Sequence, residues 1–224
     1  MRTTFLISAV LLLGMSAASQ ANAGVCGSVT GNIVKNCGFE TLGASSIPSW
    51  TVTGNTEGGY NGAYWGVDNS NPHSGSYEGY FGVQGGGGSS VGTLGPFLNL
   101  SQKLSAVPGM LYQITFYLDQ DGPTNAPGYT NYFDAYFNGV QLMSETNAPN
   151  SGGYQKFTFT REAGGASPAS EVLSFDFQND DDYFFFDDVS AKPMGFAPEP
   201  ASLLLIAPAL GGLLFLARRR RQSI

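Results

Sequence analysis

The feature that most constrains the fold is a series of short runs of β-branched and aromatic residues, separated by clusters of turn-forming residues. Between residues 24 and 197, no segment of useful length shows the 3.6-residue period of an amphipathic helix. In Leu111–Asp119, apolar residues alternate with more polar ones, which is typical of a strand with one packed face. Such runs predict an all-β fold of about nine strands, arranged as two sheets packed face to face.

A hairpin is predicted where Asn138-Gly139 separates two of these runs, because this dipeptide readily adopts the positive φ angles of a type I′ turn. The 31 glycines and 12 prolines accompany 42% hydrophobic residues, so the composition suits a turn-rich folded domain better than a disordered chain. Later strands are predicted at Phe157–Phe159, Val172–Phe177 and Tyr183–Val189.

Residues 1–23 have the three-part layout of a secretory signal peptide. Arg2 precedes an apolar run, Phe5–Leu13, and small residues follow as far as Ala21-Asn22-Ala23. This layout predicts cleavage before Gly24. The alternative is an uncleaved membrane anchor, which is less favoured because the apolar run is too short to span a membrane comfortably and ends in an Ala-x-Ala site. The protein is therefore predicted to be exported.

The C-terminal residues 197–224 contain a second apolar segment. Ala201–Ala217 carries no charge over 17 residues, and four arginines, Arg218, Arg219, Arg220 and Arg221, follow it directly. A helix of this length would reach about 25 Å, slightly less than a typical hydrocarbon core. We expect a single transmembrane helix that keeps the arginines in the cytoplasm and the domain of residues 24–196 outside.

Pro198, Glu199 and Pro200 stand immediately before this segment. The order of Pro-Glu-Pro, short apolar helix and arginine cluster at the chain end resembles the PEP-CTERM sorting signal of exported bacterial proteins. The resemblance implies recognition by an exosortase, which would process an inner-membrane intermediate and leave the domain at the cell surface or in the extracellular matrix. The alternative is a plain single-pass anchor with a proline-rich stalk.

The domain between the two ends resembles exported jelly-roll modules related to galactose-binding-like and carbohydrate-binding domains. The matching segments are Asn32–Glu40, Pro48–Trp50, His73–Tyr77, Leu100–Phe116 and Phe186–Ser190. The resemblance implies a jelly-roll β-sandwich whose first strand contains Asn32–Glu40 and in which Trp50 is buried.

A structural calcium ion is implied by the same resemblance, with Glu40 and Asp187 as ligands. Strand alternation would place Phe185, Asp187 and Val189 on one face, where an unpaired carboxylate among apolar neighbours would need a cation. Asp188 would then point outward, and it is the alternative ligand if the strand is bulged. Hydrogen bonding of the carboxylates to backbone amides remains the competing interpretation.

Cys37 departs from the resemblance, since these modules usually carry a small residue at its position. Cys26, 11 residues earlier, is a ready partner in an oxidising compartment, so we expect a disulfide between them. The alternative is a pair of free thiols.

Sugar recognition needs exposed aromatic rings beside polar groups, because the faces of a pyranose are apolar and its edges carry hydroxyls. The sequence offers Tyr60, Tyr64 and Trp65 in a stretch rich in glycine and asparagine. Their glycan-binding role competes with simple packing beneath loops.

Charge excludes some partners. Residues 24–197 hold five basic residues against sixteen acidic ones, a net charge of −11, which argues against binding to nucleic acid. No nucleophile motif or paired carboxylate spacing selects an enzyme. The sequence predicts a non-catalytic, glycan-binding envelope or matrix protein; the alternatives are a structural surface or biofilm matrix protein without a specific small ligand and, less favoured, a glycoside hydrolase.

Overall fold

The computed structural model describes residues 24–56, 64–82, 97–120, 131–164, 171–179 and 182–196. The predicted signal peptide, the predicted sorting segment and Tyr60 lie outside the described residues. Within the described ranges, no helix is long and apolar enough to cross a membrane. The predicted spanning segment, Ala201–Ala217, is not among them.

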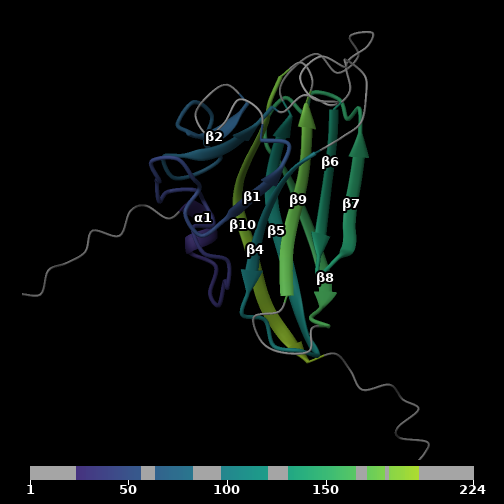
Figure 1. Ribbon diagram of the computed structural model, residues 1–224. Coiled ribbons are helices and arrows are strands. Elements are labelled where there is room, and N and C mark those ends of the chain that lie inside the picture. The colour runs from purple at the N-terminus through teal and green to yellow at the C-terminus, as the bar shows by residue number, and fades with distance from the viewer. Residues whose placement is uncertain are drawn as a thin grey trace, which may run out of the picture.

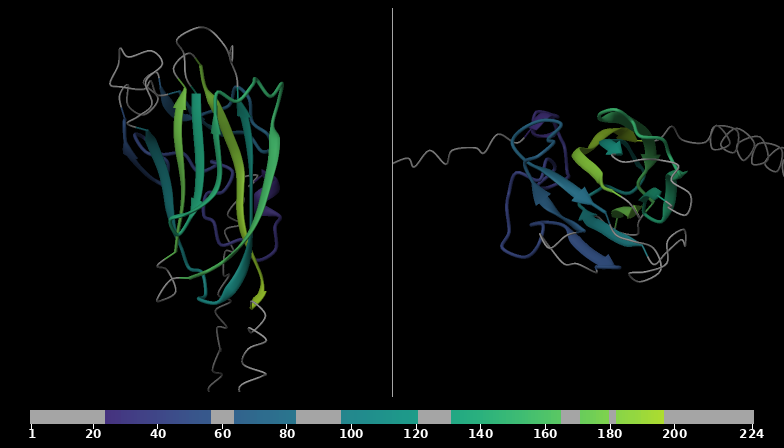
Figure 2. Two further views of the ribbon diagram at one scale, coloured as in Figure 1. Left: turned by 90° about the vertical axis from the view of Figure 1, so that its right-hand side faces the viewer. Right: turned by 90° about the horizontal axis from the view of Figure 1, so that it is seen from above.

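Two five-stranded antiparallel sheets pack face to face as a β-sandwich (Figures 1 and 2). A short helix, α1 (Gly24–Gly27), precedes them. Sheet A has the strand order β1-β4-β9-β6-β7, and sheet B has the order β2-β3-β10-β5-β8. The strands are β1 Thr51–Gly54, β2 Trp65–Asp68, β3 Glu78–Phe81, β4 Leu98–Leu104, β5 Met110–Gln120, β6 Asn131–Phe137, β7 Val140–Thr146, β8 Gln155–Glu162, β9 Glu171–Asn179 and β10 Phe184–Phe196.

The eight strands from β3 to β10 follow jelly-roll topology. Consecutive strands mostly cross from one sheet to the other, which gives the orders β3-β10-β5-β8 and β4-β9-β6-β7. The predicted all-β sandwich is confirmed, with ten strands in the described residues rather than about nine. The short strands β1 and β2 extend the two sheets at one edge.

Local sequence explains the best-defined elements. In β5, Tyr112, Ile114, Phe116 and Leu118 are all buried, as the alternation predicts. The β6–β7 turn has positive φ at both Asn138 and Gly139, 50° and 74°, so the predicted hairpin is confirmed.

The core is dominated by phenylalanine. Phe186 of β10 is fully buried and lies at its centre, with ring contacts to both sheets and to the N-terminal segment. Its ring centroid is 4.6 Å from that of Phe175 and 5.4 Å from that of Phe177, both on the facing sheet. The remaining ring neighbours of Phe186 are Phe39, Phe81, Phe116 and Phe133.

The segment Asn32–Glu40 is not a strand, contrary to the expectation drawn from the resemblance. It runs as turns beside β10, where Ile33 N donates to Ala191 O and Val189 N donates to Cys37 O. Positive φ angles at Asn36 and Phe39, 47° and 58°, break the extended conformation that a strand needs. The segment still contributes to the core, since Phe39 is fully buried against Trp50.

A one-residue bulge interrupts β10. Asp187 pairs with Tyr117 and Ser190 pairs with Thr115, so β10 contains one residue more than β5 over this stretch. Asp188 occupies the bulge with a φ of 49°. The bulge reverses which side chains face the core after Asp187 and thereby creates a polar site on the outer face of sheet B.

Candidate functional site

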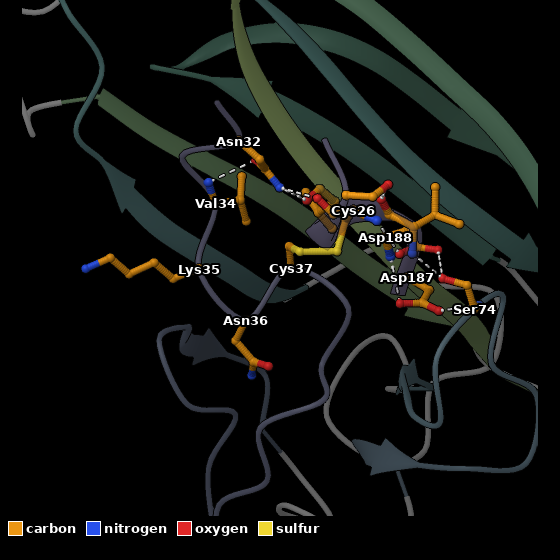
Figure 3. Close-up of a disulfide and its surroundings, with 12 residues drawn as sticks. Cys26, Asn32, Val34, Lys35, Asn36, Cys37, Ser74, Asp187 and Asp188 are labelled. Carbon is orange, nitrogen blue, oxygen red and sulfur yellow. Dashed lines mark hydrogen bonds between the residues drawn. A yellow bond between two sulfur atoms is a disulfide. The ribbon is translucent and has the colours of Figure 1, made fainter. Parts of the chain in front are cut away.

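Asp187 and Asp188 are both buried, although neither faces the core. Figure 3 shows them beside Ser74. Phe184 and Phe186 point between the sheets, so Phe185 and Asp187 lie on the outer face of sheet B, and the bulge returns Val189 to the core. The prediction that Phe185, Asp187 and Val189 share one face is therefore wrong. The bulge that would make Asp188 the alternative ligand is present, and the Asp188 side chain is fully buried.

The loop of residues 73–77 covers both aspartates. Asp187 Oδ2 accepts hydrogen bonds from the backbone amides of His73 and Ser74, at 3.1 and 3.2 Å. Asp188 Oδ2 lies 2.7 Å from His73 Nδ1 and also accepts the Ser74 hydroxyl, while its Oδ1 accepts the Cys26 amide at 2.9 Å. Burial, followed by the negative charge of Asp188, raises the pKa of Asp187 to about 8.

Glu40 holds the other end of this loop. Its Oε1 accepts the amides of Ser76 and Tyr77 at 2.7 and 3.1 Å. Among the described residues, the side chains whose ligand atoms gather within 4.8 Å are His73, Asp187 and Asp188, a group that does not include Glu40. The carboxylate oxygens suit a hard cation, yet the loop amides already satisfy much of their capacity. Calcium binding at Glu40 and Asp187 therefore stays a prediction.

The predicted disulfide joins Cys26 and Cys37 (Figure 3). It links α1 to the segment that flanks β10. Asn32 Nδ2 donates to Cys26 O at 3.2 Å, and Cys37 O accepts the amide of Val189 just beyond the bulge. The covalent bond therefore stabilises the N-terminal segment against the strand that carries the two aspartates.

The aromatic residues proposed from sequence have different environments. Trp65 lies in β2 and is only 7% exposed, so neither face of its ring is open to a sugar. Tyr64 is partly buried and packs against the core, while Tyr60 lies outside the described residues. Trp50 is 7% exposed and stacks on Phe39, which confirms its expected burial.

A different aromatic surface lies on the outer face of sheet A. In β6, Phe133, Ala135 and Phe137 point into the core, which places Tyr132, Asp134 and Tyr136 on the opposite face. Both tyrosine hydroxyls donate to Asp134 Oδ2, and Gln141 Nε2 donates to Asp134 Oδ1 at 3.2 Å. The two rings thereby lean over a buried carboxylate and are fixed in orientation.

Polar residues from neighbouring strands continue this surface. Asp176 of β9 is the register partner of Asp134, and Asn99 of β4 is the register partner of Asp176. Asn99 Nδ2 donates to Asp176 Oδ1 at 2.7 Å. Burial raises the pKa of Asp176, and the charge of Asp134 adds to this effect.

Phe97 extends the aromatic surface, because its ring stacks on Tyr132 with a centroid distance of 4.4 Å. We call this surface, formed by Phe97, Asn99, Tyr132, Asp134, Tyr136 and Asp176, the sheet-A face. Beyond its edge lies a hollow of about 540 Å³ lined in part by Thr51, Ser101 and Lys103. Ser101 and Lys103 follow Asn99 at two-residue intervals on β4, so the polar surface runs along the strand into this hollow.

Sequence reasoning missed the sheet-A face. The alternation of Tyr132, Asp134 and Tyr136 with three apolar residues was a readable local signal for an aromatic and acidic outer surface. Asn99 and Asp176 gave no such signal, because their place beside Asp134 depends on which strands become neighbours.

No protein-family model matches the sequence, and neither does any curated protein. The solved structures to which this chain is similar include TmCBM61 in complex with β-1,4-galactotriose, with a TM-score of 0.47 and 18% identity over 73% of this chain and 99% of that one. The CBM22-1 xylan-binding domain of Paenibacillus barcinonensis Xyn10C has a TM-score of 0.46 and 12% identity over 71% and 93%. The Stig cyclase Fisc of Fischerella sp. TAU has a TM-score of 0.47 and 19% identity over 74% and 98%. Binding modules and enzymes occur together in this set, so the likeness assigns no ligand to this chain.

Proposed function

We propose that this protein is an exported, non-catalytic polysaccharide-binding protein that recognises its ligand on the sheet-A face. The observation that carries the proposal is the fixed pair of rings, Tyr132 and Tyr136, above Asp134. Aromatic rings provide an apolar surface for a pyranose face, and adjacent amides and carboxylates bind the hydroxyls at its edges.

The hydrogen bonds within the site also assign roles to its polar atoms. Both tyrosine O–H groups donate to Asp134, and the phenol oxygen of Tyr136 can still accept a hydrogen bond from a ligand. Gln141 is exposed and retains a second N–H, and Asp176 retains an oxygen that Asn99 does not engage. This surface matches a ligand with many hydroxyl groups.

The contacts favour binding over hydrolysis. A glycosidase needs one carboxyl group free to protonate the leaving oxygen and a second that attacks or activates water. Asp134 is 1% exposed and accepts hydrogen bonds from three side chains, so it is held in place and covered by the tyrosines. Asp176 alone does not supply the pair.

The binding test uses the purified full chain and a panel of soluble neutral and acidic polysaccharides in affinity electrophoresis. We expect retardation by at least one polymer, and loss of that retardation in Tyr136→Ala. Lys192→Ala, an exposed residue on sheet B, is the matched control and should bind as the wild type does. Absence of retardation by every polymer, or equal retardation of Tyr136→Ala, would overturn the proposal. Release of reducing ends that Asp176→Asn abolishes would indicate a hydrolase instead.

Sorting and localisation form a second part of the proposal. The Pro-Glu-Pro, apolar segment and arginine cluster of residues 198–221 support export, membrane anchoring and exosortase processing before surface or matrix deposition. Deletion of residues 198–221 should release the protein from the membrane fraction and abolish its surface accumulation. Identical fractionation of the deletion variant and the wild type would argue against a sorting function.

Structural calcium at Glu40 and Asp187 is the third part. Its support is that the two carboxylates engage opposite ends of one loop, residues 73–77. A cation held between them would fix this loop over the β10 bulge, and it would have no part in ligand chemistry on the sheet-A face.

A further inference from the structure

A separate hollow of about 340 Å³ lies at an open edge of the sandwich, where the β7–β8 connection passes the end of β5. Its lining includes Leu118, Gln120, Glu145, Pro149, Gln155 and Phe157. None of these residues belongs to the sheet-A face. The volume lies at the lower end of the range for small-molecule sites, which suits a single sugar ring.

Gln120 lines this hollow and carries an unsatisfied acceptor. Its side chain is 4% exposed, and its Oε1 has no hydrogen-bond partner among the described residues. The backbone around it is well held, since Gln120 N donates to the hydroxyl of Ser151 at 3.0 Å and Gln120 O accepts the Ser151 amide at 3.3 Å. A buried acceptor without a partner is unfavourable, so this oxygen calls for a donor from outside the chain.

Glu145 contributes a second acceptor group. It is partly buried at the end of β7, and its carboxyl group has no hydrogen bond or ion pair within the part of the chain that the structure describes. Burial alone raises the pKa of Glu145. Two acceptors without donors thus line one small hollow.

The hollow also has apolar walls, formed by Leu118, Ala148, Pro149 and Phe157. Phe157 is partly buried, and its inner side packs against Phe116 with ring centroids 5.5 Å apart. Together with Leu118 and Pro149, it provides the apolar surface that a pyranose face requires. The lining also includes the side-chain amides of Asn150 and Gln155, so it offers hydrogen-bond donors as well as the two acceptors to the hydroxyls of a sugar.

We propose that this hollow binds one neutral pyranose residue, whose adjacent hydroxyls donate to Glu145 and Gln120 and whose apolar face lies against Phe157. The site extends the proposed carbohydrate binding from a polymer surface to a single sugar, such as a chain end or a branch. It shares no residue with the sheet-A face, so the two proposals fail independently.

The test is saturation-transfer NMR on the purified full chain in a sugar-free detergent, with methyl glycosides of glucose, galactose, mannose and xylose as probes. We expect saturation of at least one glycoside, on one side of its ring. Glu145→Gln and Gln120→Leu should each weaken its binding about tenfold, because each removes an acceptor that the sugar would use. Glu162→Gln, an exposed residue of β8 outside the hollow, should leave binding unchanged.

Loss of sugar binding can be distinguished from loss of folding in these variants. Glu145 has no partner to lose among the described residues, so Glu145→Gln should melt at or above the wild-type temperature. Tyr136→Ala should abolish polymer retardation and retain monosaccharide saturation. The inference is overturned if no glycoside is saturated, or if Glu145→Gln binds as the wild type does.

Discussion

Glu78 of β3 lies directly opposite Asp68 of β2, and the hydroxyl of Ser70 joins them, at 3.1 Å from Glu78 Oε1 and 2.9 Å from Asp68 Oδ1. Burial, followed by the hydrogen bond and charge of Asp68, raises the pKa of Glu78 to about 8. The folded protein therefore keeps a proton on Glu78 that the unfolded chain releases near the ordinary value of 4.5.

This difference predicts that stability falls as the pH rises. Between about pH 4.5 and pH 8 the folded state binds more protons than the unfolded state at Glu78, so the unfolding free energy decreases through that window. Thermal melts at pH 5 and pH 8 should show a lower melting temperature at pH 8. Glu78→Gln mimics the protonated group and should reduce the dependence to the part contributed by Asp187, whose pKa is also raised to about 8, with a melting temperature at pH 8 no lower than that of the wild type. An unchanged pH profile in Glu78→Gln would contradict the assignment.

The Cys26–Cys37 disulfide is expected to contribute about 2–3 kcal/mol through closure of its short loop. The double variant Cys26→Ser/Cys37→Ser should lower the melting temperature by roughly 5–10 °C. Reductant should lower the wild type to a similar temperature and leave the double variant unaffected. Equal melting of oxidised and reduced wild type would show that the bond does not stabilise the fold.

Much of the sandwich could be predicted from local patterns. The alternation in β5 and the Asn138-Gly139 turn depend only on neighbouring residues, and both are confirmed. The Cys26–Cys37 disulfide could also be predicted, because the sequence contains only two cysteines. Each of these predictions needs only a short segment of the sequence or the number of cysteines, and no knowledge of which strands are neighbours.

The functional surfaces depend on tertiary arrangement. The bulge at Asp188 shifts the alternation of β10 by one residue. The residue types in this strand do not predict a bulge, so the faces assigned to Asp187 and Val189 were wrong. Asn99, Asp134 and Asp176 come together only because β4, β9 and β6 are neighbours. Trp65 lies in a stretch rich in glycine and asparagine, which is typical of a loop, yet the pairing of β2 with β3 buries its side chain.

The central ring of the core offers a test of the packing. Phe186 is fully buried among six other phenylalanine rings, whereas Phe185 is only partly buried on the opposite face. Phe186→Ala should cost about 3–5 kcal/mol because it removes a large side chain and leaves a cavity. Phe185→Ala should cost much less in the same denaturant melts. Similar losses of unfolding free energy in the two variants would contradict the assignment of Phe186 to the core face of β10 and Phe185 to the outer face.

Calcium should raise the melting temperature if Glu40 and Asp187 bind it. A ligand at one hundred times its dissociation constant stabilises the folded state by about 2.7 kcal/mol, a shift of roughly 5–10 °C here. Glu40→Gln should remove the calcium-dependent increment, and Glu162→Gln should retain it. If calcium leaves the wild-type melt unchanged, the two carboxylates serve only as acceptors for the amides of residues 73–77.

Variants at Trp65 and Tyr136 test which aromatic residues stabilise the fold and which bind the ligand. Trp65 is 7% exposed in β2, so Trp65→Ala should cost about 3–5 kcal/mol and lower the melting temperature. Tyr136 is partly exposed on the sheet-A face, where its removal opens Asp134 to water while Tyr132 and Gln141 still donate to it. Tyr136→Ala should therefore remain folded and lose at least about tenfold in polysaccharide affinity, as expected for loss of a central aromatic anchor. Isothermal titration on both variants, at a temperature where each is folded, decides the matter: weaker binding by Trp65→Ala together with unchanged binding by Tyr136→Ala would move the glycan site to β2.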